Sequence, residues 1–244
     1  MAKIIQWNIR SLKQRLIYLN VLINSLSPEI FCLQETKLKD TNFEYSGKLY
    51  KAYHHINMNK KIAAGGTSIF IKRRIPQSEI QLNTNLQTKA IRVTLNKPIT
   101  ICSIYIAPDE NFTKEQLIDL RNQLNPPFII LGDFNAHSPL WEKGCQESDT
   151  RAKIIEDFFT QSNLCLLNDL SPTHIDPENF KKSCIDLTFC HPDLASDFQW
   201  SVLDNLHDSD HFPITMDSKI TQNSPIPQFF NFKKNKLDRF YTRM

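Results

Sequence analysis

The sequence predicts an α/β fold, and two observations carry that prediction. About ten short strand-like runs share the chain with three amphipathic helices, and the two kinds of element are interspersed rather than strictly alternating. Strict alternation is typical of a single parallel sheet, so a single parallel sheet is not expected. With 244 residues, 41% of them hydrophobic, the chain can bury a sizeable core in one domain.

The three helices are predicted from apolar spacing and capping residues. After Ser11, leucine and isoleucine recur at alternating four- and three-residue spacing as far as Leu26, where a Ser-Pro pair ends the run. The segment Thr113–Gln116 is a capping box in front of a second leucine stripe. Asp149 is placed to cap a third helix that ends near Asn163.

Six of the strand-like runs carry polar residues with useful chemistry at or near their ends. The runs are 3–7, 29–33, 99–104, 128–131, 184–189 and 212–216, and the polar residues are Asn8, Glu35, Tyr105, Asp133 with Asn135, Asp186, and Asp210 with His211. Each one alone is explained by an ordinary turn or cap. All six together favour a site at the rim of a sheet.

The same segments resemble a known superfamily. They are WN at 7–8, QET at 34–36, SIYIAP at 103–108, GDFNAHSPLW at 132–141, SCIDLTF at 183–189 and SDHFPI at 209–214. This order resembles the exonuclease III/DNase I-like (endonuclease/exonuclease/phosphatase) superfamily and, more narrowly, the endonuclease domain of LINE-type (non-LTR) retrotransposons of the I-element and jockey-like group. The resemblance implies a four-layer α/β sandwich, with two mixed sheets packed face to face and helices outside.

The resemblance also implies a function. It points to a divalent-metal-dependent endonuclease that nicks one strand of double-stranded DNA and leaves a 3′-OH primer for target-primed reverse transcription. A reverse transcriptase domain in the same polyprotein and a nuclear location are expected on the same ground. Residues 1–217 would form the endonuclease domain, and residues 218–244, with two prolines and a basic end, a linker and tail.

Hydrolysis of a phosphodiester needs charge neutralisation, and a metal ion can supply it. Glu35 is a hard oxygen ligand suited to Mg²⁺, with Mn²⁺ as a substitute, and Asn8 and Asp210 are candidates to complete that site. The resemblance implies the same roles.

The attacking water and the leaving oxygen have candidates of their own. Asp133 can orient or activate the water, and Asn135 can hold a phosphate oxygen. His211 paired with Asp186 can become a cation that grips the phosphate, and Tyr105 can donate a hydrogen bond to the phosphate or leaving group. Asp133 and the Asp186–His211 pair both remain candidates for the general base.

Contacts with DNA are expected from local features. The resemblance assigns phosphate contacts to Thr173 and Ser209, and it makes the loop 174–182 a hairpin that probes a groove near the cut. His137 is as compatible with a turn as with a phosphate contact. The basic candidates are Arg10, Lys13, Arg15, Lys60, Lys61, Lys72, Arg73, Arg74, Lys181 and Lys182.

Bulk properties exclude several other classes. The net charge of +3 neither demands nor excludes nucleic acid. Six cysteines without a Cys-x-x-Cys pair predict a reducing intracellular compartment and no zinc site, and five glycines form no phosphate loop. No apolar run approaches the roughly 18 residues that would span a membrane.

Two residues depart from the family pattern, because Glu142 and Asp208 stand where relatives usually have glycine. They put the strength of any activity in doubt but not its chemistry. Two alternatives stay open: another phosphoesterase of the superfamily, such as an abasic-site endonuclease or a lipid or inositol phosphate hydrolase, and a non-catalytic DNA-binding module. Retention of every candidate catalytic residue argues against the second alternative.

Overall fold

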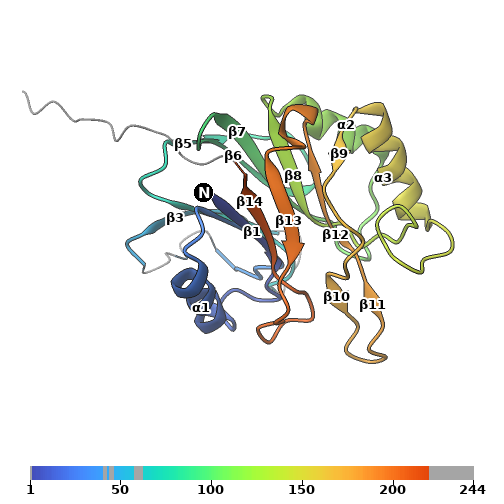
Figure 1. The fold of residues 1–244 in the computed structure, drawn as a ribbon, viewed down its shortest axis with the longest axis horizontal. Helices are drawn as coiled ribbons and strands as arrows, with labels where there is room; N and C mark the ends of the chain where they lie inside the picture. Colours follow the sequence, from blue (N-terminus) through green and yellow to red (C-terminus); the bar gives the residue numbers. More distant parts are fainter. Residues whose placement is uncertain (1, 41–42, 44–46, 58–62, 220–244) are drawn as a thin grey trace, which may run out of the picture.

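The computed structural model describes residues 2–40, 43, 47–57 and 63–219. Within these ranges two six-stranded mixed sheets pack face to face, with α1 outside one sheet and α2 and α3 outside the other (Figure 1). The predicted α/β sandwich is therefore confirmed. From residue 220 onward the predicted linker and tail lie outside the described residues, as do Lys60 and Lys61.

The first sheet has the strand order β13-β14-β1-β2-β4-β3, in which only β1 and β2 are parallel neighbours. The last strand begins and ends two residues later than the run predicted for it, because Phe212 pairs outside this sheet, donating its backbone N–H to Thr173. The strand bounds are β1 Lys3–Asn8, β2 Ile30–Gln34, β3 Tyr50–His55, β4 Thr67–Lys72, β13 Phe198–Val202 and β14 Ile214–Ser218.

The second sheet has the order β5-β6-β7-β8-β12-β9, with β7 and β8 as its parallel pair. A separate two-stranded hairpin, β10–β11, projects below it (Figure 1). The bounds are β5 Gln77–Ile80, β6 Gln87–Thr94, β7 Pro98–Tyr105, β8 Phe128–Asp133, β9 Cys165–Leu166, β10 His174–Ile175, β11 Lys182–Ser183 and β12 Asp186–Cys190.

Three α-helices and a short 3₁₀ turn, Pro192–Leu194, complete the described fold. Helix α1 spans Leu16–Leu26, and so begins a turn later than its apolar stripe suggests. Helix α2, Lys114–Asn122, has the predicted capping box, and α3, Thr150–Gln161, is capped by Asp149 as predicted. None of the helices in the described ranges is long and apolar enough to cross a membrane.

Strand alternation divides the apolar residues among three layers. Side chains such as Trp7 and Phe31 pack on α1, and side chains such as Phe128 and Ile130 pack on α2 and α3. The residues that alternate with these along each strand, including Ile4 in β1 and Ile129 in β8, fill the space between the two sheets. Successive side chains of a strand point to opposite faces, so each strand contributes alternate residues to the layer under the helices and to the layer between the sheets.

The layer between the sheets changes from apolar to polar along the strands. In β1 the side chains facing this layer are Ile4, then Gln6, then Asn8, and in β8 they are Ile129, Leu131 and Asp133. The polar members are paired across the layer. Gln6 donates to the carbonyl of Gly132 on the other sheet and accepts from Thr188, and Gln34 donates to Ser103; the bonds are 2.9–3.0 Å.

Gly132 allows β8 to approach β7 closely just before Asp133. A Cβ at this position would collide with the backbone carbonyl oxygen of Ile104 on β7. Because the obstacle is backbone and not a flexible side chain, a substitution can be accommodated only by moving the strand.

We expect Gly132→Ala to lower the free energy of unfolding by about 1–3 kcal/mol through overpacking. The matched control is Gly144→Ala, since Gly144 also has a positive φ, of 86°, but its Cβ would meet nothing within 4 Å. Chemical denaturation of both variants measures the difference. Equal losses at the two positions would contradict the close-approach explanation.

Candidate functional site

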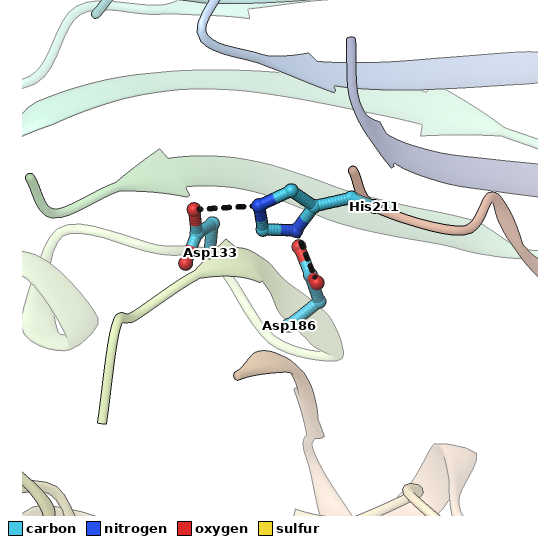
Figure 2. Close-up of side chains that lie close together, drawn as sticks. All are labelled: Asp133, Asp186 and His211. Atoms are coloured by element: carbon cyan, nitrogen blue, oxygen red, sulfur yellow. Dashed lines mark hydrogen bonds and ion pairs between the residues drawn. The ribbon is translucent and has the colours of Figure 1, made fainter. Parts of the chain in front are cut away.

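A buried cluster of two carboxylates and one imidazole lies where β8 ends and β12 begins. Asp133 and Asp186 are register partners on these strands, and His211 comes from the segment that precedes β14. Figure 2 shows the imidazole of His211 between the two carboxylates: its Nδ1 lies 2.7 Å from Asp186 Oδ2 and its Nε2 lies 3.9 Å from Asp133 Oδ2. The side chains are only 1–6% exposed.

The protonation of this cluster follows from its burial and its charges. Burial alone would lower the pKa of His211, but the charge and hydrogen bond of Asp186, with Asp133 and Asp210, raise it to about 9. Burial raises the pKa of Asp133 to about 7, and the nearby Asp186 adds to the rise. At neutral pH, His211 is therefore a cation held by Asp186, and Asp133 is close to its own midpoint.

Asn8 joins this cluster to a third carboxylate, that of Glu35. Its side-chain amide donates to Asp133 Oδ2 at 2.8 Å and to Glu35 Oε1 at 3.3 Å. Tyr105 donates its hydroxyl to the same Glu35 oxygen at 3.0 Å. The two parallel strand pairs bring these side chains together. Asn8 ends β1 beside β2, which leads to Glu35, and Tyr105 ends β7 beside Asp133 on β8.

Lys37 binds the other oxygen of Glu35, at 2.7 Å. Burial would raise the pKa of Glu35, but the hydrogen bond and charge of Lys37, together with Asn8, outweigh it and hold the pKa below its ordinary value. Glu35 and Lys37 both have left-handed backbones, with φ of 48° and 50°, an uncommon conformation for non-glycine residues that recurs at functional sites. Burial and Glu35 together raise the pKa of Tyr105, so its hydroxyl keeps its proton.

Glu35 and Tyr105 open onto a cavity of about 190 Å³. This is the accessible side of the arrangement, because Asp133 and His211 are almost fully buried. The other residues that line it are Lys37, Asn57, Ala64, Gly65, Gln87, Ala107, Pro108 and Asp109.

Asn135 lies in the turn after β8, again with a left-handed backbone, at φ of 48°. Its backbone N–H donates to Asp133 Oδ1 at 3.0 Å, which fixes that carboxylate. Its side-chain amide donates to the carbonyl of Ile106 at 3.1 Å and so ties the turn to the end of β7. The structure thus places Asn135 at the site, next to Asp133.

Asp210 is turned toward Arg10, with which it forms an ion pair of 2.8 Å. The neighbouring residue His211 is the one that enters the cluster. Asp210 lies in a bend just before His211, which is a residue of an isolated bridge. Completion of the Glu35 site by Asp210 therefore stays a prediction. Arg10 is paired with a carboxylate in this structure, and its contact with DNA also stays a prediction.

Thr173 and Ser209 are buried supports in this structure. The hydroxyl of Thr173 accepts from the backbone N–H groups of Ile185 and Asp186, at 3.2 and 3.1 Å. The hydroxyl of Ser209 donates to the Asn8 carbonyl at 2.8 Å and accepts from the N–H of His211 at 3.3 Å. Both residues hold the backbone around the cluster, and their phosphate contacts stay a prediction.

The two departures from the family pattern each find a cationic or imidazole partner. Glu142 lies 2.6 Å from Nδ1 of His137, whose side chain is 42% exposed. Arg15 lies 3.7 Å from the carboxylate of Asp208 and donates to the Asp208 carbonyl at 2.6 Å. Lys181 and Lys182 lie in the β10–β11 hairpin and are exposed, away from the buried cluster.

The donor set fits a hard divalent cation. The donors are carboxylates, and Glu35, which faces a cavity, carries one of them. Asp133, Asp186 and His211 form a second grouping whose potential ligand atoms lie within 4.8 Å of one another. Within the described residues, Asp186 Oδ1 is also a buried oxygen without a hydrogen-bond partner. In the assigned orientation Asn8 turns its amide nitrogen toward Glu35, and its oxygen accepts from the Arg10 N–H.

Two residues at this site were missed by the sequence reasoning: Lys37 and, as a partner of His211, His174. Lys37 has a signal in hindsight, since a lysine two residues after a candidate metal ligand can be its counter-ion. His174 acts through a contact with His211, and a single sequence carries no sign of that contact. Arg15, a basic candidate for DNA contact, pairs with Asp208 in the structure, and its DNA contact stays a prediction.

Comparison with known proteins finds relatives among retrotransposon proteins. A family model described as endonuclease-reverse transcriptase matches residues 99–215, which include the ends of β7, β8 and β12 that build the cluster. The chain is thus similar to the endonuclease domains of LINE-type (non-LTR) retrotransposons. It is 25% identical over 239 residues to a probable RNA-directed DNA polymerase from transposon BS of Drosophila melanogaster, covering 93% of this chain and 25% of that protein.

A second relative is the RNA-directed DNA polymerase from the mobile element jockey of Drosophila funebris, 26% identical over 129 residues and covering 51% of this chain and 14% of that protein. The chain thus spans a quarter or less of the length of these relatives. Among solved structures, the endonuclease domain of TRAS1, a telomere-specific non-LTR retrotransposon, matches with a TM-score of 0.75 and 21% identity, covering 91% of this chain and all of that one.

An AP endonuclease from Leishmania major has the same fold, with a TM-score of 0.69 and 17% identity over 88% of this chain and 86% of that one. The family therefore shares its sandwich with nucleases of other specificity, and the fold alone does not select a substrate.

We expect Asp186→Asn to move the pKa of His211 from about 9 down toward the ordinary value of 6.5, because the variant removes the charge that stabilises the imidazolium. The shape and the hydrogen-bond acceptor are kept. NMR titration of the histidine rings measures this, with His54, whose pKa burial lowers, as the internal control. An unmoved His211 titration would contradict the assigned ion pair.

Proposed function

We propose that this chain is a divalent-metal-dependent endonuclease that nicks one strand of double-stranded DNA. The observation that carries the proposal is the junction of the buried Asp133–His211–Asp186 cluster with Glu35 and Tyr105 through Asn8. It brings together a base, a cation, a proton donor and a metal-binding carboxylate at one edge of the sandwich. These are the groups that phosphodiester hydrolysis requires.

In the proposed reaction, Asp133 takes a proton from a water whose oxygen attacks the phosphorus. Its pKa, near 7, suits an acceptor at neutral pH. Cationic His211 stabilises charge that develops on the phosphoryl oxygens, and Asp186 keeps it protonated. Tyr105 keeps its proton and donates a hydrogen bond to the departing 3′-oxygen. The proton taken up by Asp133 returns through solvent, so that this oxygen leaves as a hydroxyl. The 3′-OH product is the end that a polymerase extends.

Glu35, with Asn8, is the proposed holder of Mg²⁺, for which Mn²⁺ can substitute. The ion would supply further neutralisation of the phosphate and leaving-oxygen charge. The low pKa of Glu35 keeps it ionised and ready to bind a cation.

The β10–β11 hairpin is the proposed DNA probe. Phe180 at its tip is 76% exposed, more than any other large apolar side chain in the described ranges, and it is followed by Lys181 and Lys182. The turn is held by Asp176, which accepts from the Glu178 N–H and the Asn179 side-chain amide at 2.8 Å. A preformed apolar tip flanked by lysines is suited to wedge into a groove and to favour easily deformed base steps.

The context of the activity is proposed from the relatives. Residues 1–217 would act as the endonuclease domain of a polyprotein with a reverse transcriptase, the nick would prime reverse transcription, and the protein would act in the nucleus. The polymerase names of the relatives, of which this chain spans a quarter or less, support that arrangement.

We expect the chain to convert supercoiled plasmid to the open-circular form with Mg²⁺ and to fail in excess EDTA. Asp133→Asn should lower the rate by about 10²–10⁴-fold, because it keeps the side-chain shape but removes the proton acceptor. Asp119→Asn, on the exposed face of α2, is the matched control and should leave the rate unchanged. A folded Asp133→Asn protein with full activity would overturn the mechanism.

We expect Phe180→Ala to redistribute nicks on a long duplex while total nicking stays close to wild type. Replacing Lys181 and Lys182 with glutamine should flatten the salt dependence of binding by up to about two contacts' worth. Nick mapping and binding isotherms at several salt concentrations measure the two effects, and Lys153→Gln on α3 is the control. An unchanged nick pattern would place specificity outside the hairpin.

A further inference from the structure

The hairpin that carries the exposed Phe180 is joined directly to the segment that carries His211. On one edge β10 pairs with β11, where His174 faces Ser183. On its other edge Ile175 donates to the Asp210 carbonyl at 2.9 Å, and Phe212 donates to the Thr173 carbonyl at 2.7 Å. His174 and His211 are consequently opposed residues of an antiparallel bridge.

Opposed residues of an antiparallel bridge put their side chains on the same face, with Cβ atoms about 4.5–5.5 Å apart. The rings of His174 and His211 accordingly pack together, with centroids 4.6 Å apart and planes inclined at 52°. Ser183 lies on the same face and fixes the His174 ring, since its hydroxyl is 3.0 Å from Nδ1. A row of three side chains therefore runs from β11 to the buried imidazole.

His211 needs such support. Asp186 holds its Nδ1 at 2.7 Å, but Nε2 is 3.9 Å from Asp133, too far for a hydrogen bond. Rotation about the Asp186 contact would swing Nε2 away from the Asp133 side of the site. The packed ring of His174 opposes that rotation. Burial and the charge of His211 lower the pKa of His174, so a neutral ring faces the cation.

We propose that His174 is a positioning residue: its ring, fixed by Ser183, holds the His211 imidazole in its working orientation and ties it to the β10–β11 hairpin. The proposal rests on the nuclease function proposed above. It assigns His174 no contact with the reacting atoms. It predicts that the ring shape matters and that the ring nitrogens contribute only through the bond to Ser183.

The kinetic test compares His174→Ala with His174→Phe on a duplex oligonucleotide in Mg²⁺. Alanine removes the packed ring and should lower kcat about ten-fold while KM stays within about two-fold, since a misplaced group costs rate rather than binding. Phenylalanine keeps a ring and should restore most of kcat. Ser183→Ala frees the ring and should give a smaller fall in kcat, which provides a second variant if His174→Ala does not fold.

A readout without DNA separates this proposal from the function on which it rests. The Nδ1 proton of His211, held by Asp186, should give a downfield NMR signal in the wild-type protein. In His174→Ala that signal should shift or broaden, and in His174→Phe it should return. This holds even if the wild-type protein nicks no DNA, a result that would overturn the nuclease function alone.

Three outcomes would overturn the positioning role. One is a folded His174→Ala protein with unchanged kcat and an unchanged His211 signal. Another is a rise in KM alone, which would make His174 a DNA contact. The third is a His174→Phe protein as slow as His174→Ala, which would mean that the ring nitrogens, and not the ring packing, carry the effect. Thermal unfolding of each variant confirms that it is folded.

Discussion

The layer between the two sheets imposes the constraint on which this site depends. A polar group buried there must find a partner across the layer, because an unpaired one costs about 1–3 kcal/mol. Gln6 meets the Gly132 carbonyl and Thr188, and one step further along the strands Asn8 meets Asp133. The Asp133 carboxylate is thus held by the same kind of bond that joins the two sheets, and the candidate site is the polar end of the core.

This placement carries energetic costs that the rest of the fold must offset. Glu35 and Asn135 adopt left-handed backbones, each costing of order 1–3 kcal/mol. Asp186 keeps one oxygen buried without a hydrogen-bond partner. Against a net stability of about 5–15 kcal/mol for a typical domain, such terms are large. The fold tolerates these costs because three apolar layers flank the site, and their packing holds the strand ends in place.

The sequence predicts most of what depends on local pattern. The strand-like runs of β1 and β8 and the caps at Thr113 and Asp149 are local, and the structure has them. The geometry of the site depends on long-range side-chain contacts. Arg15 meets Asp208 across 193 residues, and no spacing rule pairs them.

The different partners of Asp210 and His211 could not be predicted from the sequence. The structure sends His211 inward and Asp210 toward Arg10, from a bend followed by an isolated bridge residue. The bridge pairs His211 with His174, which lies far away in the chain, and no spacing rule predicts that pairing.

The charge balance around the site explains how a polyanion can approach so many carboxylates. Five carboxylates, of Glu35, Asp133, Asp186, Asp208 and Asp210, face four cations, Lys37, Arg10, Arg15 and His211. Within these ion pairs the carboxylates exceed the cations by one, and Asp133, with its pKa near 7, carries only part of its charge. A divalent cation at Glu35 would outweigh that excess, so binding of metal and binding of phosphate would favour each other. Asp208, despite replacing a usual glycine, brings no net repulsion, because Arg15 neutralises it.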